Sequence, residues 1–206
     1  MAGAGPSGGA GGDTDRARLR AARHAEGTSY LGMAIFLGGW AMMFAALFFS
    51  YGVMRIHAAT WPPPGALRLP IAMPLVNTLV LLASSVTLQL GLYTIRNWRV
   101  AELPRWIVAT IGLGVAFLGL QVAVWRDVWA RGLRPDTSTY GSVFYALTAV
   151  HALHVVAGLI ALVVVLVPAL RGQYRKNRHT PVRMMAMFWH FIDIVWVLMF
   201  LAVYVF

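Results

Sequence analysis

Long apolar stretches alternate with short polar segments along this chain of 206 residues. A bilayer's hydrocarbon core is crossed by a helix of about 20 apolar residues. Prolines lie at or near the starts of several stretches, where a missing N–H does little harm to a helix, and no strand-like alternation suggests a barrel. The pattern predicts an all-α fold, an integral membrane bundle of five transmembrane helices. These helices are expected at residues 29–56, 70–95, 105–126, 141–170 and 184–206.

The composition supports a membrane protein. Hydrophobic residues make up 59% of the chain and charged residues 12%, whereas a soluble domain carries about 25% charged residues. Cysteine is absent, which excludes disulfides, thiolate metal sites and thiol catalysis. The net charge of +10 does not indicate nucleic-acid binding, because the basic residues lie between the apolar runs, where they set orientation in a membrane.

The first 28 residues are predicted to form a disordered cytoplasmic tail, with residues 29–206 as the membrane domain, because the segment starts as a Gly- and Ala-rich run without periodicity. The apolar run that follows is too long for a cleaved signal peptide. The tail holds four Lys or Arg, 96–105 three and 171–183 five, whereas the opposite side of the membrane holds five in all. The positive-inside rule therefore predicts a cytoplasmic N-terminus and an external C-terminus.

Polar residues inside the spans are the candidates for function. In the last span His190 and Asp193 are three residues apart, so they share one helix face. A carboxylate at the bilayer centre costs about 2.5–3.5 kcal/mol, so it must be buried against protein. In the fourth span His151 and His154 share a face with Thr148.

These histidines allow two interpretations. His151 and His154 together with His190 have the chemistry to ligate a metal or a haem, with Asp193 as a further ligand or as an orienting group. Alternatively, they hydrogen-bond across helices and lock the bundle. Asn77, Ser84, Ser85, Thr87 and Gln89 in the second span are interpreted as helix packing. With no second carboxylate inside a span, the chain alone forms no proton wire.

Four motifs in order resemble one known family. They read WPPPG at 61–65, NTLVLLASSVT at 77–87, YGSVFY at 140–145 with HALHV at 151–155, and FWHFIDIVW at 188–196. By these motifs the chain resembles cytochrome c oxidase subunit III, in its short five-helix bacterial form. The resemblance extends from about residue 30 to residue 206.

The resemblance implies a non-catalytic subunit of a proton-translocating cytochrome c oxidase in the bacterial inner membrane, active in aerobic respiration. Such a subunit holds no haem, copper or catalytic residue. It packs mainly on subunit I, which carries the haems and copper, with subunit II and small subunits as further partners. The family also binds phospholipid in a cleft between helices and supports proton uptake.

The site residues follow from this resemblance. We expect a helix-packing polar network formed by His151, His154, His190, Asp193 and Trp40. Lipid head groups are expected to contact Arg171, Arg175 and Trp189. Trp40 lies where the family usually carries a buried glutamate, and its indole N–H can donate to a neighbouring histidine but cannot ionise.

That departure keeps one alternative open, a subunit-III-like partner of a nitric oxide reductase. A second alternative, of a different class, is a haem-binding membrane cytochrome that uses His151 or His154 together with His190 as ligands. A transporter is disfavoured by the lack of an inverted repeat.

Overall fold

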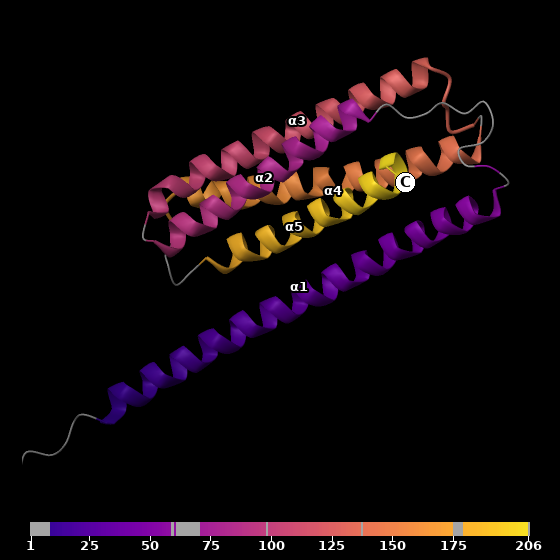
Figure 1. Ribbon diagram of the computed structural model, residues 1–206. Helices are drawn as coiled ribbons and strands as arrows, with labels where there is room; N and C mark the ends of the chain where they lie inside the picture. Colours follow the sequence, from indigo (N-terminus) through magenta and orange to yellow (C-terminus); the bar gives the residue numbers. More distant parts are fainter. Residues whose placement is uncertain are drawn as a thin grey trace, which may run out of the picture.

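The computed structural model describes residues 9–58, 60, 71–97, 99–136, 138–174 and 179–205. Within these residues the chain is all-α, and each apolar stretch forms one long helix (Figure 1). The prediction of five transmembrane helices is confirmed, since the spans agree with the predicted ranges to within a few residues at most ends. The helices are α1 Gly9–His57, α2 Ala72–Arg96, α3 Leu103–Ala130, α4 Thr139–Leu170 and α5 Thr180–Phe200, with a 3-10 turn at Val100–Glu102 and a final π-helical turn at Leu201–Val205.

Local sequence signals explain several helix ends. Ser138 caps α4 by accepting a hydrogen bond from the Gly141 amide at 3.1 Å. Gly172 follows the last residues of α4 with a φ of 64°, a left-handed conformation that glycine adopts without strain. Pro181 lies in the first turn of α5, where its missing N–H leaves no hydrogen bond unmade.

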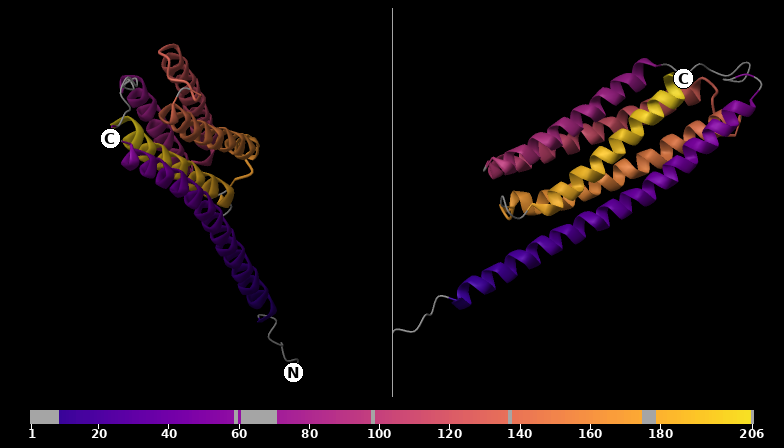
Figure 2. Two further views of the ribbon diagram at one scale, coloured as in Figure 1. Left: turned by 90° about the vertical axis from the view of Figure 1, so that its right-hand side faces the viewer. Right: turned by 60° about the horizontal axis from the view of Figure 1, so that its bottom comes forward.

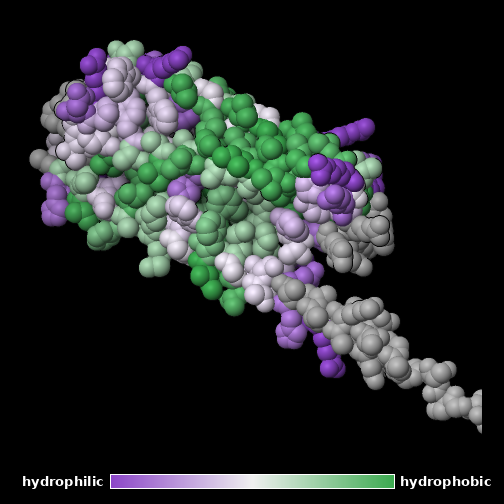
Figure 3. All heavy atoms as spheres, turned by 180° about the vertical axis from the view of Figure 1, so that it is seen from behind, coloured by the Kyte–Doolittle hydropathy of each residue, from purple (hydrophilic) through white to green (hydrophobic). Residues whose placement is uncertain are grey.

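Helix α5 is the centre of the bundle. It packs against α1, α2 and α4, while α3 packs against α2 and α4. Helix α1 runs along the outside, separated from α3 (Figures 1 and 2). In the most apolar stretch of α1 only 6% of the residues are buried, whereas in the corresponding stretch of the α5 span 56% are buried. The surface shows a broad apolar band between more polar ends, as a membrane requires (Figure 3).

The N-terminal segment differs from the expected disordered tail. Helix α1 begins at Gly9, so the described part of the segment, residues 9–28, is helical and extends beyond the ends of the other helices (Figure 1). The reason lies in residues 13–26, which are rich in Ala and Arg and contain no proline. These are strong helix formers. Residues 1–8 and the WPPPG motif at 61–65 lie outside the described residues.

Candidate functional site

The polar face of α5 meets a row of hydroxyl groups on α2. The indole N–H of Trp189 donates to Ser84 Oγ at 2.9 Å, and that of Trp196 donates to Thr78 Oγ1 at 2.9 Å. All four side chains are buried. A buried indole N–H needs a hydrogen-bond acceptor. At this depth water does not supply one, and the hydroxyl oxygens of Ser84 and Thr78 on α2 do.

Ser85 joins the two ionisable groups of α5. Its hydroxyl donates to Asp193 Oδ2, and its Oγ lies 2.8 Å from His190 Nδ1. The hydroxyl has a single proton, so Nδ1 of His190 must be the donor in the second contact. The Gln89 side-chain oxygen lies 3.4 Å from His190 Nε2. His190 and Asp193 thus form one cluster with Ser85, which the sequence analysis had assigned to packing alone.

His151 and His154 lie on α4 and contact other elements. His154 Nδ1 donates to the Val150 carbonyl, 2.6 Å away in its own helix. Its ring centroid is 4.1 Å from that of Trp40, with the two rings perpendicular, and 5.0 Å from that of Phe44. Trp40 therefore does reach a histidine, but through a ring contact.

His151 is enclosed by aromatic rings. Its centroid lies 5.0 Å from Trp196 and 5.9 Å from Phe117, and neither ring nitrogen has a hydrogen-bond partner among the described side chains and backbone. The predicted network is therefore divided into a Ser85 cluster on the α2–α5 side and an aromatic cluster around the α4 histidines. Within the described part of the chain, no three His, Asp or Glu side chains come together as metal ligands.

Two more hydrogen bonds tie α3 into the bundle. Asn77 donates to the Gln121 side-chain oxygen at 3.1 Å, which links α2 to α3. The Trp125 indole donates to Thr148 Oγ1 at 3.0 Å, which links α3 to α4. Polar side chains in the membrane thus pair between neighbouring helices.

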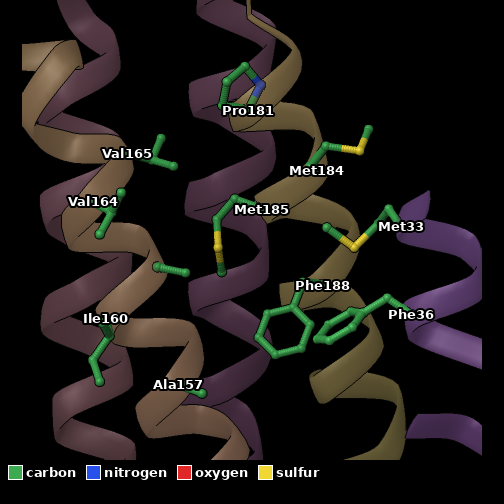
Figure 4. Close-up of a pocket in the computed structure, with 11 residues that line it drawn as sticks. Met33, Phe36, Ala157, Ile160, Val164, Val165, Pro181, Met184, Met185 and Phe188 are labelled. Atoms are coloured by element: carbon green, nitrogen blue, oxygen red, sulfur yellow. The ribbon is translucent and has the colours of Figure 1, made fainter. Parts of the chain in front are cut away.

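An apolar cleft is lined by α1, α4 and α5 together (Figure 4). Its larger part has a volume of about 570 Å³, and a second part of about 300 Å³ continues it toward Trp40 and His154. The rings of Phe36 and Phe188 lie together where the two parts meet, with centroids 5.9 Å apart. Both parts share the lining residues Phe36, Ala157, Ile160 and Phe188.

The residues expected at lipid head groups have different positions. Trp189 is 0% exposed, and its ring fits against the glycines of α3 and α4 at Gly114 and Gly158, so its predicted head-group contact is wrong. Arg171 follows α4 and is exposed, so its role stays a prediction. Arg175 lies outside the described residues. Arg183, which belongs to the same basic stretch but was not predicted to contact head groups, has its guanidinium 4.9 Å from the centre of the Tyr30 ring.

Comparison with known proteins decides the family. The family model described as cytochrome c oxidase subunit III matches residues 21–206. The chain belongs to the cytochrome c oxidase subunit III family. A probable cytochrome c oxidase subunit 3 of Mycobacterium tuberculosis is 38% identical over 176 residues, which cover 84% of this chain and 86% of the relative.

Cyanobacterial relatives support the same assignment. The cytochrome c oxidase subunit 3 of Thermostichus vulcanus is 34% identical, with 85% of this chain and 86% of the relative covered. That of a Synechocystis species is 34% identical, with 84% and 73% covered. As a member of this family, the chain is a multi-pass membrane protein and an accessory subunit of an oxidase. The nitric oxide reductase and haem cytochrome alternatives are not favoured.

Proposed function

We propose that this chain is subunit III of a haem–copper oxidase that uses cytochrome c, and that it stabilises the catalytic subunit without catalytic residues of its own. Family membership over residues 21–206 is the observation that carries the proposal. The side chains of the bundle also fit a structural role, because its indoles, hydroxyls and amides are engaged with neighbouring helices. The haems and copper are assigned to the partner subunit I, with subunit II and small subunits as further neighbours.

The second element of the proposal is phospholipid bound in the cleft between α1 and the α4–α5 pair. The lining is apolar and suits acyl chains. Arg183 lies over Tyr30 near the starts of α5 and of the α1 span, where a cation would meet a lipid phosphate. A lipid held there would fill the space that α1 leaves open and so support proton uptake and the durability of the neighbouring active site.

The third element is orientation in the bacterial inner membrane. The start of α1 and the ends of α2 and α4 lie at one end of the helices, and the end of α5 lies at the other (Figure 1). The excess of Lys and Arg lies at the first end. By the positive-inside rule we assign that end, with residues 1–28, to the cytoplasm and residues 29–206 to the membrane domain.

The experiment is purification of the oxidase from cells with and without this chain. We expect the chain to be recovered with the catalytic subunit in equal amount, and its deletion to reduce the number of turnovers before inactivation. Recovery with another complex, or a deletion that changes neither the composition nor the lifetime of the oxidase, would refute the proposal.

The lipid element has its own matched pair of variants. Ala157→Trp should fill the cleft that Ala157 lines, whereas Ala149→Trp alters an exposed position on α4 outside that lining. Mass spectrometry of the intact complex should show fewer bound phospholipids for Ala157→Trp only. Equal lipid counts in both variants would exclude the cleft as the lipid site.

A further inference from the structure

A second groove lies between α5 and α2. It has a volume of about 370 Å³ and shares no lining residue with the apolar cleft. It combines a polar centre with apolar walls. The lining residues are Leu82, Ser85, His190, Asp193, Ile194, Val197 and Leu198.

Asp193 places a buried carboxyl group in this groove that is only partly hydrogen-bonded within the described part of the chain. The residue is only 4% exposed, and Ser85 satisfies one carboxyl oxygen, Oδ2. The other oxygen, Oδ1, has no hydrogen-bond partner within the described part of the chain. A buried carboxyl oxygen without a donor is destabilising, and at membrane depth water is not available to supply one.

The walls of the groove indicate what covers it. Ile194 is 60% exposed and Leu198 51%, so a ring of large apolar side chains surrounds the polar centre. Lipid tails would satisfy this ring but would bring no donor to Asp193. A transmembrane helix satisfies both, because helix association in membranes depends on close packing and on hydrogen bonds between helices.

We propose that the α2–α5 groove is the docking site for a transmembrane helix of a partner oxidase subunit, which places one hydrogen-bond donor against Asp193. The donor is a hydroxyl, an amide or a cationic side chain, since each complements a carboxyl oxygen. The inference rests on the proposed function, because it names the surface by which this accessory subunit meets its oxidase. His190 would lie beside the same donor, held by its contact with Ser85.

The direct test is photo-crosslinking in the assembled oxidase. A photoreactive amino acid replaces Ile194 in the groove or, as control, Val115, which is 55% exposed on α3. We expect position 194 to yield a covalent adduct with a membrane subunit of the oxidase at a yield at least tenfold above that of position 115. Adducts of position 194 with lipid alone, with a second copy of this chain, or at the same yield as position 115 would overturn the inference.

The donor is tested by two substitutions at one position. Asp193→Asn retains an acceptor oxygen, whereas Asp193→Leu removes it. After a detergent wash of the oxidase, we expect retention of this chain to fall about tenfold further for Asp193→Leu than for Asp193→Asn, a factor that corresponds to about 1.4 kcal/mol. Equal retention would exclude a donor to Asp193.

The two substitutions can also change folding within the chain, because Asp193 binds Ser85. The crosslinking experiment at position 194 leaves Asp193 and Ser85 unchanged, so it tests the docking site independently of any folding defect caused by the substitutions at Asp193. A chain that is recovered with the oxidase but crosslinks only to lipid refutes the docking site and leaves the proposed function standing. A chain that is absent from the purified oxidase refutes the proposed function itself.

Discussion

Trp189 is wedged between helices at glycine positions, and this makes Gly158→Ala a sharp test of the packing. A Cβ at Gly158 would lie 2.9 Å from Trp189 Cζ3 and 3.2 Å from Ile192 Cδ1. The indole has no room to retreat, because it is fully buried and its N–H is bonded to Ser84. Overpacking of this kind costs about 1–3 kcal/mol, while replacing glycine in a helix returns up to about 1 kcal/mol. We expect a net loss of about 1–2 kcal/mol.

Gly119→Ala is the matched control. Gly119 lies in α3, and a Cβ there would meet nothing within 4 Å. The same change of residue should therefore leave stability unchanged or raise it by up to about 1 kcal/mol. The two substitutions differ only in what the new methyl group meets, so the sign of the difference tests the wedge.

The assay is unfolding of the full chain in mixed micelles by increasing SDS, followed by far-ultraviolet circular dichroism. A rescue variant adds Trp189→Phe to Gly158→Ala, because phenylalanine lacks the outer ring atoms that the methyl group would touch. The cost of Gly158→Ala should then shrink. If Gly158→Ala stabilises the chain as Gly119→Ala does, or if its cost is unchanged beside Trp189→Phe, the wedge is refuted.

Three further predictions follow from the polar pairs. A double-mutant cycle on Asn77 and Gln121, with leucine at each position, should give a coupling of about 0.6 kcal/mol and at most about 1.7 in SDS unfolding; zero coupling would mean that the pair is not formed. Trp196→Phe should destabilise the chain by about 1 kcal/mol through its lost bond to Thr78, and a Thr78→Val background should reduce that cost. Asp127→Asn removes an exposed ion pair with the arginine one turn later and should change the unfolding free energy by less than about 1 kcal/mol, so a larger loss would contradict its exposure.

The sequence was sufficient for the fold because each span carries its own signal. Apolar length determines a membrane helix whatever its neighbours are, and Ser138, Gly172 and Pro181 mark helix ends locally. The expectation of a disordered N-terminal tail came from its first twelve residues, which are rich in Gly and Ala. The later residues of the segment favour helix by intrinsic propensity, and α1 begins at Gly9.

The candidate site was less predictable, because helical spacing shows which residues share one face of a helix but not which helix packs against that face. His190 and Asp193 do share a face, and His151 and His154 lie on one helix, yet the two pairs meet different partners. Trp189 directly precedes His190 but points about 100° away on the helix, into the glycines of α3 and α4. Its burial follows from the position of those glycines, which no pattern within α5 contains.

The pairs between α2 and α5 also answer how two apolar helices choose one alignment. Lipid tails are as apolar as leucine, so burying apolar side chains favours no particular register in a membrane. Hydrogen bonds between the helices do favour one register, since each bond is lost if one helix slides by a turn. Trp196 meets Thr78 near the start of α2, and one to two turns earlier on α5 Trp189 and His190 meet Ser84 and Ser85 further along α2, as antiparallel helices require. The hydroxyls of α2 therefore set the position of α5, and α5 in turn positions every other helix that packs on it.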